Sequence, residues 1–164
     1  MKINIVLYSP EIPQNTGNIS RTCAVTGAVL HIIKPIGFEI SDRTLKRAGL
    51  DYWDKLEVHY YENFEDFKAK NADAELYYFS AHGKQAHTDI EYPDNSYLVF
   101  GRESVGLPRE LVEENFDRSV RIPMRKTLRC LNLSNSVAIA VYELLRQNGF
   151  EGMESELSIE VQHF

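Results

Sequence analysis

The chain has 164 residues, of which 43% are hydrophobic and 26% charged, a composition that suits one globular domain. It contains no apolar run near the roughly 18 residues that a membrane span needs, and its first apolar stretch is too short for a secretory signal, so we expect a cytoplasmic protein. Cys23 and Cys130 lack metal or redox spacing, and His82 and His87 lack the partners typical of zinc, so we expect no metal.

The net charge of −6 is unevenly distributed along the chain. Residues 51–100 contain eleven Asp or Glu and four Lys or Arg, and the segment from Glu151 onward contains four Glu and no basic residue. Residues 118–129, by contrast, contain five basic residues and no acidic one. One side of the molecule could therefore attract phosphate, although charge alone fits an ordinary mixed surface better.

The predicted elements alternate between strands and helices. "INIVLY" at 3–8 predicts a buried strand that Pro10 and Pro13 end. A helix follows, with Asn15 or Thr16 as N-cap and Gly27 as its C-terminal stop. The next strand covers 29–35, and Ser41 is expected to cap a short helix. Further strands are predicted at 56–61, 74–81, 96–101 and 118–124, and further helices at 63–70, 108–114 (with Pro108 in its first turn) and 132–148.

This alternation predicts an α/β fold with a mostly parallel sheet flanked by helices. We expect one domain over 1–150 and an acidic tail over 151–164. The last helix is apolar on nearly every face between Val137 and Leu145, which is typical of a helix buried on all sides. A second subunit is one possible cover for part of that surface, and the core of a single chain is the other.

Three loops that follow predicted strands carry groups suited to a polar ligand. They are "FSAHGK" at 79–84, "FGRESVGLPRE" at 100–110 and "IPMRKTLRCLNLS" at 122–134. Ligands of open α/β sheets gather at the carboxyl ends of the strands. Gly101 and Gly106 allow close backbone approach, but the loop lacks the Lys-Ser/Thr pair of a phosphate loop. The chain has no G-x-G-x-x-G either, so a Rossmann-type site is unsupported.

Several segments together resemble one known family. They are "LYSPEIPQNTGNISRTCAVTGAVLHIIKPIGF", "RAGLDYW", "LVFGRESVGLP" and "IPM…RCLNLSNSVAIAVYE". In this order they resemble the SPOUT class of RNA methyltransferases, and within it the small TrmL/YibK type, the tRNA (cytidine/uridine-34)-2′-O-methyltransferases. The resemblance runs from about Asn4 to Phe150, nearly the whole chain.

The resemblance implies an S-adenosyl-L-methionine-dependent enzyme that methylates the ribose 2′-hydroxyl of the wobble nucleotide, in the anticodon loop of tRNA. It also implies a homodimer and a C-terminal trefoil knot, which neither composition nor periodicity indicates and which general topology rules disfavour. By position, the residues that match the family's cofactor pocket are Phe79, Gly101, Ile122, Cys130 and Leu131. Cys130 departs from the usual serine, a change that is tolerated if the main chain makes the contact.

The same resemblance suggests catalytic residues, each with an alternative role. Arg21 lies in the "NTGNISR" motif, where we expect a phosphate or alkoxide clamp rather than a base, because guanidinium is a poor base. Glu103 either orients the ribose or a motif partner, accepts a proton, or binds backbone amides. Asn15 is expected to cap its helix and position Arg21. Asn132 and Ser134 either contact the cofactor or acceptor, or cap the last helix.

Six basic residues are candidates for contact with tRNA phosphate: Arg125, Lys126, Arg129, Arg43, Lys46 and Arg47. Two other functions stay open. One is a ribose methyltransferase acting on another tRNA or rRNA position, and the other is a non-catalytic RNA-binding protein with a vestigial cofactor pocket.

Overall fold

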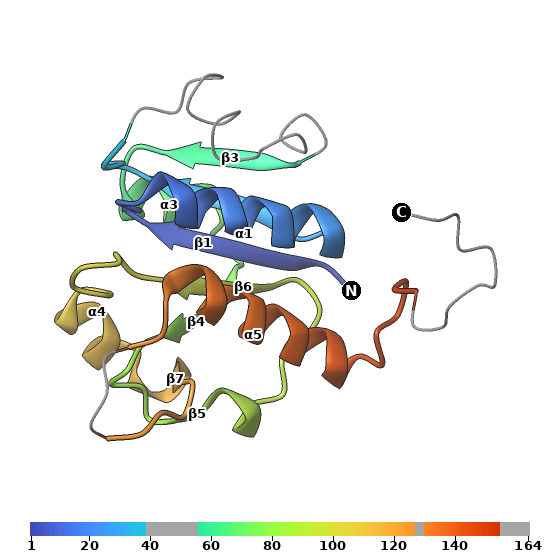
Figure 1. The fold of residues 1–164 in the computed structure, drawn as a ribbon. Coiled ribbons are helices and arrows are strands. Elements are labelled where there is room, and N and C mark those ends of the chain that lie inside the picture. The colour runs from blue at the N-terminus through green and yellow to red at the C-terminus, as the bar shows by residue number, and fades with distance from the viewer. Residues whose placement is uncertain (39–55, 127–129, 155–164) are drawn as a thin grey trace.

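The computed structural model describes residues 1–38, 56–126 and 130–154. Within them, one sheet of seven strands has the order β3-β2-β1-β6-β4-β7-β5, and every pair of neighbouring strands is parallel (Figure 1). The strands are β1 (Ile3–Tyr8), β2 (Val29–Ile33), β3 (Val58–Tyr61), β4 (Glu75–Phe79), β5 (Gln85–Ala86), β6 (Ser96–Phe100) and β7 (Ser119–Arg121). The helices are α1 (Pro13–Thr26), α3 (Phe64–Lys70), α4 (Arg109–Glu114) and α5 (Leu133–Gln147), with short 3-10 turns η2 (His87–Asp89) and η3 (Phe116–Arg118).

Helices cover both faces of the sheet, as the alternating side chains of the strands require. Ile5 and Leu7 of β1 point to the face that α1 and α5 cover, and these two helices lie side by side there (Figure 1). Val6, between them, joins the core on the opposite face, together with residues of α3 and α4. The predicted α/β class with a mostly parallel sheet is therefore confirmed.

Strand β7 lies between β4 and β5, although it follows both in the sequence. Phe79 of β4 pairs with Val120 on one side, and Gln85 of β5 pairs with the same residue on the other. Residues 80–84 connect the two outer strands, and Gly83 packs so closely on the Val120 backbone that a Cβ atom would collide with it. The trefoil knot itself remains a prediction.

The predicted N-terminus of the first helix was wrong. Helix α1 begins at Pro13, with Ile12 as the N-cap residue, so Asn15 and Thr16 lie inside the helix and are buried. Proline suits the first turn because its missing N–H has no helical partner to lose. The predicted stop is confirmed, since Gly27 has a φ of 72° in the left-handed region.

The other predicted elements that fall within the described residues are present, with shifted ends. The last helix is flanked by Asn132 and Asn148 as its caps, and Pro108 is the residue just before α4. The two-residue strand β5 and both 3-10 turns were not predicted. The expected Ser41 helix and most of the acidic tail lie outside the described residues. No helix among the described residues is long and apolar enough to cross a membrane.

A buried polar network joins the strands on the α3 side. His31 is 3% exposed, its Nδ1 lies 2.8 Å from the Tyr61 hydroxyl, and its Nε2 lies 3.2 Å from Asn4 Oδ1. Asn71 extends the network by donating to Tyr61. Burial, helped by the nearby His59, lowers the pKa of His31 from 6.5 to about 3. The imidazole is therefore neutral in the folded protein at neutral pH.

This network predicts a specific loss of stability in acid. Between pH 6.5 and about 3, His31 of the unfolded chain binds a proton that the folded protein excludes. The free energy of unfolding should therefore fall as the pH decreases, by up to about 1.4 kcal/mol per pH unit from this residue. In His31→Gln the fall between pH 7 and pH 4.5, measured by urea unfolding, should be smaller. His82→Gln, which removes an exposed imidazole outside this network, should keep the wild-type slope, and equal slopes in all three proteins would contradict the prediction.

Candidate active site

The three predicted ligand loops start from adjacent strand ends. In the sheet, β4 lies between β6 and β7, and its last residue, Phe79, pairs with both Phe100 and Val120. The next N–H, of Ser80, donates to the Val120 carbonyl at 2.9 Å. Gly101 follows Phe100 directly, and Ile122 follows the end of β7 at Arg121. The structure thus brings Phe79, Gly101 and Ile122 together at the carboxyl ends of three adjacent strands.

The loop after β6 is closed on itself and tolerates only glycine at its first position. Arg102 and Gly106 exchange two backbone hydrogen bonds, of 3.1 and 2.9 Å. A side chain at Gly101 would collide with the backbone of Gly106 and Leu107. Gly106 has a φ of 74°, which favours glycine as well. Close packing at Gly101 and the positive φ at Gly106 thus explain both glycines of "GRESVGLP" without any phosphate-binding role.

Two glutamates, one in this loop and one just before α1, join the two segments by reciprocal hydrogen bonds. The Glu103 carboxylate accepts hydrogen bonds from the N–H of Glu11 at 2.8 Å, the N–H of Ile12 at 3.1 Å and Asn15 Nδ2 at 3.2 Å. In return, the Glu11 carboxylate accepts from the Ser104 N–H at 3.0 Å and its hydroxyl at 2.9 Å. These bonds from Ser104 lower the pKa of Glu11. Glu103 therefore binds backbone amides, as one alternative held, and Glu11 is a positioning residue that the sequence analysis missed.

Asn15 extends these hydrogen bonds to the last helix. Its Oδ1 accepts from Asn132 Nδ2 at 2.9 Å, while its own Nδ2 serves Glu103. Asn132 Oδ1 in turn accepts from the N–H and hydroxyl of Ser134, at 2.9 and 2.6 Å, and from the N–H of Asn135 at 3.4 Å. Asn132 is thus the N-cap of α5, as one alternative held. Contact of Asn132 and Ser134 with cofactor or acceptor stays a prediction.

Arg21 lies on α1, six residues after Asn15, and is exposed. Asn15 lies inside the helix, and its side chain bonds to Glu103 and Asn132. Asn15 therefore does not have the capping role expected for it. The Arg21 side chain lies on the solvent-exposed side of α1.

The residues expected to bind cofactor differ in burial. Phe79 is 8% exposed and stacks on Phe100 with ring centroids 4.7 Å apart. Ile122 is half-buried, and Cys130 and Leu131 are exposed on the way to α5. The Phe79 ring is packed in the core, and the turn that follows it begins at Ser80. Cys130 is a free, exposed thiol, whereas burial raises the pKa of Cys23 to about 12 and keeps that thiol neutral.

An unpaired imidazole nitrogen lies beside these residues. His87 follows β5, whose Ala86 pairs with Arg121, so it neighbours the turn at Ile122. Its ring centroid is 6.4 Å from that of Phe79. Its Nδ1 is buried and has no hydrogen-bond partner among the described residues. A buried donor or acceptor left in this state favours a polar ligand group nearby.

The basic residues expected to contact RNA are only partly visible. Arg125 and Lys126 are exposed in the segment after β7. Arg43, Lys46, Arg47 and Arg129 lie outside the described residues. Among the described residues no group of three or more His, Cys, Asp or Glu is arranged to hold a metal ion.

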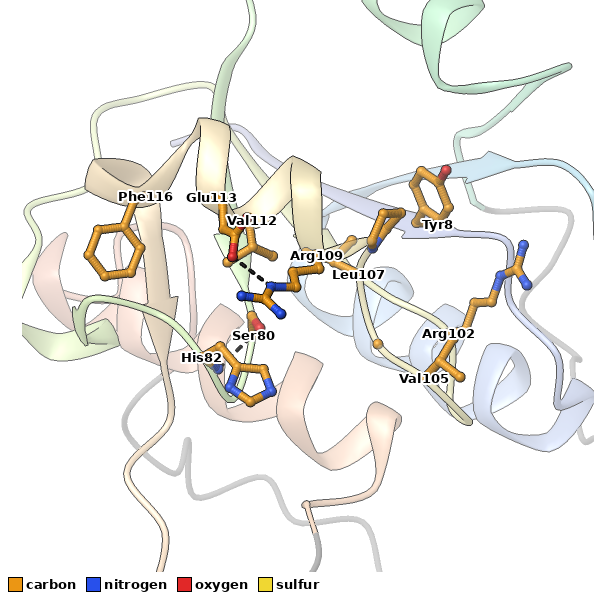
Figure 2. Close-up of a pocket in the computed structure, with 12 residues that line it drawn as sticks. Tyr8, Ser80, His82, Arg102, Val105, Leu107, Arg109, Val112, Glu113 and Phe116 are labelled. Carbon is orange, nitrogen blue, oxygen red and sulfur yellow. Dashed lines mark hydrogen bonds and ion pairs between the residues drawn. The ribbon is translucent and has the colours of Figure 1, made fainter.

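A cavity of about 680 Å³ lies between the 101–107 loop and α4 (Figure 2). It is lined by Tyr8, Ser80, His82, Arg102, Val105, Gly106, Leu107, Pro108, Arg109, Val112, Glu113 and Phe116. Several of them lie in the predicted ligand loops at 79–84 and 100–110, but none is among the residues expected to bind cofactor, contact RNA or act in catalysis. They come from three separate segments, and single residues such as Phe116 carry no local signal of a cavity.

Comparison with known proteins assigns this chain to a family of RNA methylases. The model of the SpoU rRNA Methylase family matches residues 2–142, so this chain belongs to that family. Among solved structures, one described as giving structural insights into the 2′-OH methylation of C/U34 on tRNA has a TM-score of 0.85 and 41% identity, over 92% of this chain and 98% of that chain.

Curated relatives are similar over nearly their full length. A relative from Geobacillus stearothermophilus, provisionally named a tRNA (cytidine(34)-2′-O)-methyltransferase, is 49% identical over 93% of this chain and 99% of its own. One from Saccharophagus degradans with the same activity in its name is 47% identical over 91% and 97%. An AdoMet-bound rRNA methyltransferase from Sinorhizobium meliloti has a TM-score of 0.77 and 25% identity, and this chain covers 56% of it.

The asparagine network predicts different results for two substitutions of one residue. Asn132→Ala removes both the cap of α5 and the bond to Asn15, so the free energy of unfolding should fall by about 1 kcal/mol. Asn132→Ser keeps an oxygen that can cap the helix and loses the donor to Asn15 without adding a charge, so its stability should stay within about 0.5 kcal/mol of wild type. Urea unfolding at pH 7 measures both. Equal destabilisation by the two changes would show that capping is not the stabilising interaction.

Proposed function

We propose that this protein methylates the ribose 2′-hydroxyl of the wobble nucleotide, cytidine or uridine 34, in the anticodon loop of tRNA, with S-adenosyl-L-methionine as methyl donor. The observation that carries the proposal is the likeness to the tRNA (cytidine(34)-2′-O)-methyltransferase relatives along almost the whole chain. The solved structure concerned with C/U34 supports the same acceptor. A tRNA substrate also makes the cytoplasm the expected place of action.

The residues at the sheet edge fit this cofactor. Turns at Gly101 and Ile122 offer backbone groups, Leu131 offers apolar surface, and His87 has a buried nitrogen without a partner among the described residues. We expect Phe79, Gly101, Ile122, Cys130 and Leu131 to bind it. The bound donor supplies a methyl group on a positively charged sulfur. The AdoMet-bound relative from Sinorhizobium meliloti supports the use of this donor.

Within this proposal, the polar network aligns the two substrates. Glu103 already accepts three hydrogen bonds from the protein, on about four lone-pair sites, so we assign it as a positioning residue rather than as a proton acceptor. Asn15 and Asn132 hold the 101–106 loop against the start of α5. Ser134 is fixed through Asn132. Such alignment is what methyl transfer to a weakly acidic hydroxyl needs most.

Arg21 acts on the RNA side. Its guanidinium clamps a phosphate or stabilises the negative charge that develops on the 2′-oxygen. Arg125 and Lys126, with Arg129, Arg43, Lys46 and Arg47, are proposed to contact tRNA phosphates. The net charge of −6 makes these local clusters the available attraction for tRNA.

The decisive experiment is mass mapping of ribose methylation in tRNA and rRNA from cells with and without this protein. Loss of methylation at position 34 supports the proposal. Loss at another tRNA position or in rRNA would instead support the alternative acceptor. Calorimetric titration with S-adenosylhomocysteine separates the remaining alternative, because a vestigial pocket would not bind it.

Arg21→Ala should separate chemistry from cofactor binding. We expect single-turnover methylation of tRNA to fall by about 100-fold or more, since a clamp on developing charge is removed. The dissociation constant for S-adenosylhomocysteine should stay within about twofold, because no cofactor contact is assigned to Arg21. Arg21→Lys keeps the charge without the forked geometry, so its methylation rate should lie between those of wild type and Arg21→Ala. If cofactor affinity fell as far as the methylation rate, Arg21 would belong to the cofactor site instead.

We also propose a homodimer that packs through the α1–α5 layer. Four apolar side chains remain exposed on these helices or at the start of α1: Val25 at 59%, Tyr142 at 50%, Ile12 at 42% and Ile139 at 39%. The two helices lie side by side on one face of the sheet (Figure 1). A second copy of the chain would cover this layer and add its basic residues to the first copy's site.

The dimer proposal predicts that a charge in this layer produces monomers. Tyr142→Glu should elute as a monomer in size-exclusion chromatography with light scattering and should lose most tRNA methylation. Tyr60→Glu is the matched control, because Tyr60 is also exposed, at 40%, but lies on the edge strand β3. A monomeric Tyr142→Glu protein with full activity would remove the functional argument for a dimer.

A further inference from the structure

The cavity shown in Figure 2 is separate from the predicted cofactor residues, yet it shares a wall with them. None of its described lining residues is among the five expected to bind cofactor. Its floor includes Gly106 and Leu107, which belong to the same closed loop as Gly101. Its volume of about 680 Å³ lies within the range of roughly 300–1,000 Å³ typical of ligand sites.

The apolar part of the cavity suits a nucleobase. Leu107 and Val112 are buried and form its base, and Phe116 stands at one side with 48% of its surface exposed. Tyr8 contributes a second aromatic ring on the opposite side (Figure 2). Phe116 is exposed and Tyr8 is half-buried, so Phe116 is the ring that offers its face to an unpaired base, as aromatic side chains of RNA-binding proteins do.

The polar part suits a phosphate. The Arg109 guanidinium lies across the middle of the cavity, between Glu113 and His82 (Figure 2). Glu113 Oε1 accepts from Arg109 Nε at 2.6 Å, which pairs one edge of the guanidinium, and the Arg109 side chain is 86% exposed. Arg102 stands at the rim beside Tyr8, as a second guanidinium (Figure 2).

The charges around the cavity favour an anion in its interior. Glu113 is the one carboxylate among the described lining residues, and it is paired with Arg109. Asp117, near Phe116 in sequence, is paired with Lys84. Glu110 and Glu114 of α4 are not part of the lining. Arg102 adds a positive charge at the rim, and together with the hydrogen bonds from Ser104 the same charge helps to lower the pKa of the Glu11 carboxyl, which is not part of the lining.

We propose that this cavity binds a nucleotide of the substrate RNA next to the one that is methylated, with its base against Phe116 and Leu107 and its phosphate on Arg109 and Arg102. The inference rests on the proposed function, because it needs an RNA substrate. The shared 101–107 loop explains how it works: the reacting ribose lies on the Gly101 side and its neighbour enters the cavity on the Leu107 side. An unpaired neighbour is required, which fits a loop of RNA rather than a duplex.

The test compares Arg109→Gln and Phe116→Ala with wild type and with Arg118→Gln. Arg118 is also an exposed arginine near α4 with a carboxylate partner, Glu75, but it does not line the cavity. Three quantities are measured for each protein: the KM for tRNA, the kcat, and the dissociation constant for S-adenosylhomocysteine. The dependence of tRNA binding on salt is measured for Arg109→Gln.

The proposal predicts that both cavity variants raise the KM for tRNA by about fivefold or more, with S-adenosylhomocysteine affinity unchanged. Arg109→Gln should also reduce the slope of log binding constant against log salt by roughly 0.7 to 0.9, as one lost phosphate contact requires, whereas Phe116→Ala should not. Variants indistinguishable from Arg118→Gln would overturn the proposal, and so would weakened S-adenosylhomocysteine binding, which would make the cavity part of the cofactor site. If the wild-type protein methylated no tRNA, the proposed function would fail first.

Discussion

The site depends on a small set of hydrogen bonds that tie three distant segments together. Asn15 donates to Glu103 and accepts from Asn132, which places the start of α1, the loop after β6 and the start of α5 in one fixed arrangement. These residues lie 88 and 117 positions apart in the chain. Asn15 and Asn132 each donate and accept a side-chain hydrogen bond within the protein, and such connected networks help to fix one geometry. The loop and the helix start are therefore already aligned before any ligand binds.

Parallel pairing supplies the second constraint. Because β6, β4 and β7 run in the same direction, the turns that follow them meet at one edge without any specific contact between their side chains. The glycine pair then allows the loop after β6 to fold tightly on itself, and Glu11 and Glu103 fix it to α1. The backbone of the sheet thus decides where the site lies, while a few polar side chains decide its shape.

The sequence predicted most of the fold because the signals were local. Apolar strand patterns, Gly27 as a helix stop and Asn132 as a cap act within a few residues of themselves, and the structure confirms all three. Asn15 was misjudged because its residue type favours a cap, while Pro13 moves the helix start upstream and turns Asn15 inward to Glu103. Strand β5 escaped prediction because two residues carry no periodicity.

The site was predictable only where a motif named it. Family resemblance drew attention to Glu103 and Asn132, but no local pattern shows that the Glu11 carboxylate accepts a hydrogen bond from Ser104. The cavity beside α4 was invisible for the same reason, because its walls come from strand ends and loops that only the folded chain assembles.

The position of β7 has a consequence for how the chain is made. Strand β5 pairs with β7 and with no other strand of the described sheet, yet β7 follows it in the sequence, after β6 and α4. During synthesis on a ribosome, residues 85–86 therefore emerge with no partner and must wait for Ser119–Arg121 to arrive between them and β4. The β7–β5 part of the sheet is therefore completed last. In a nascent chain that halts before β7, only β1, β2, β3, β4 and β6 have their sheet partners present.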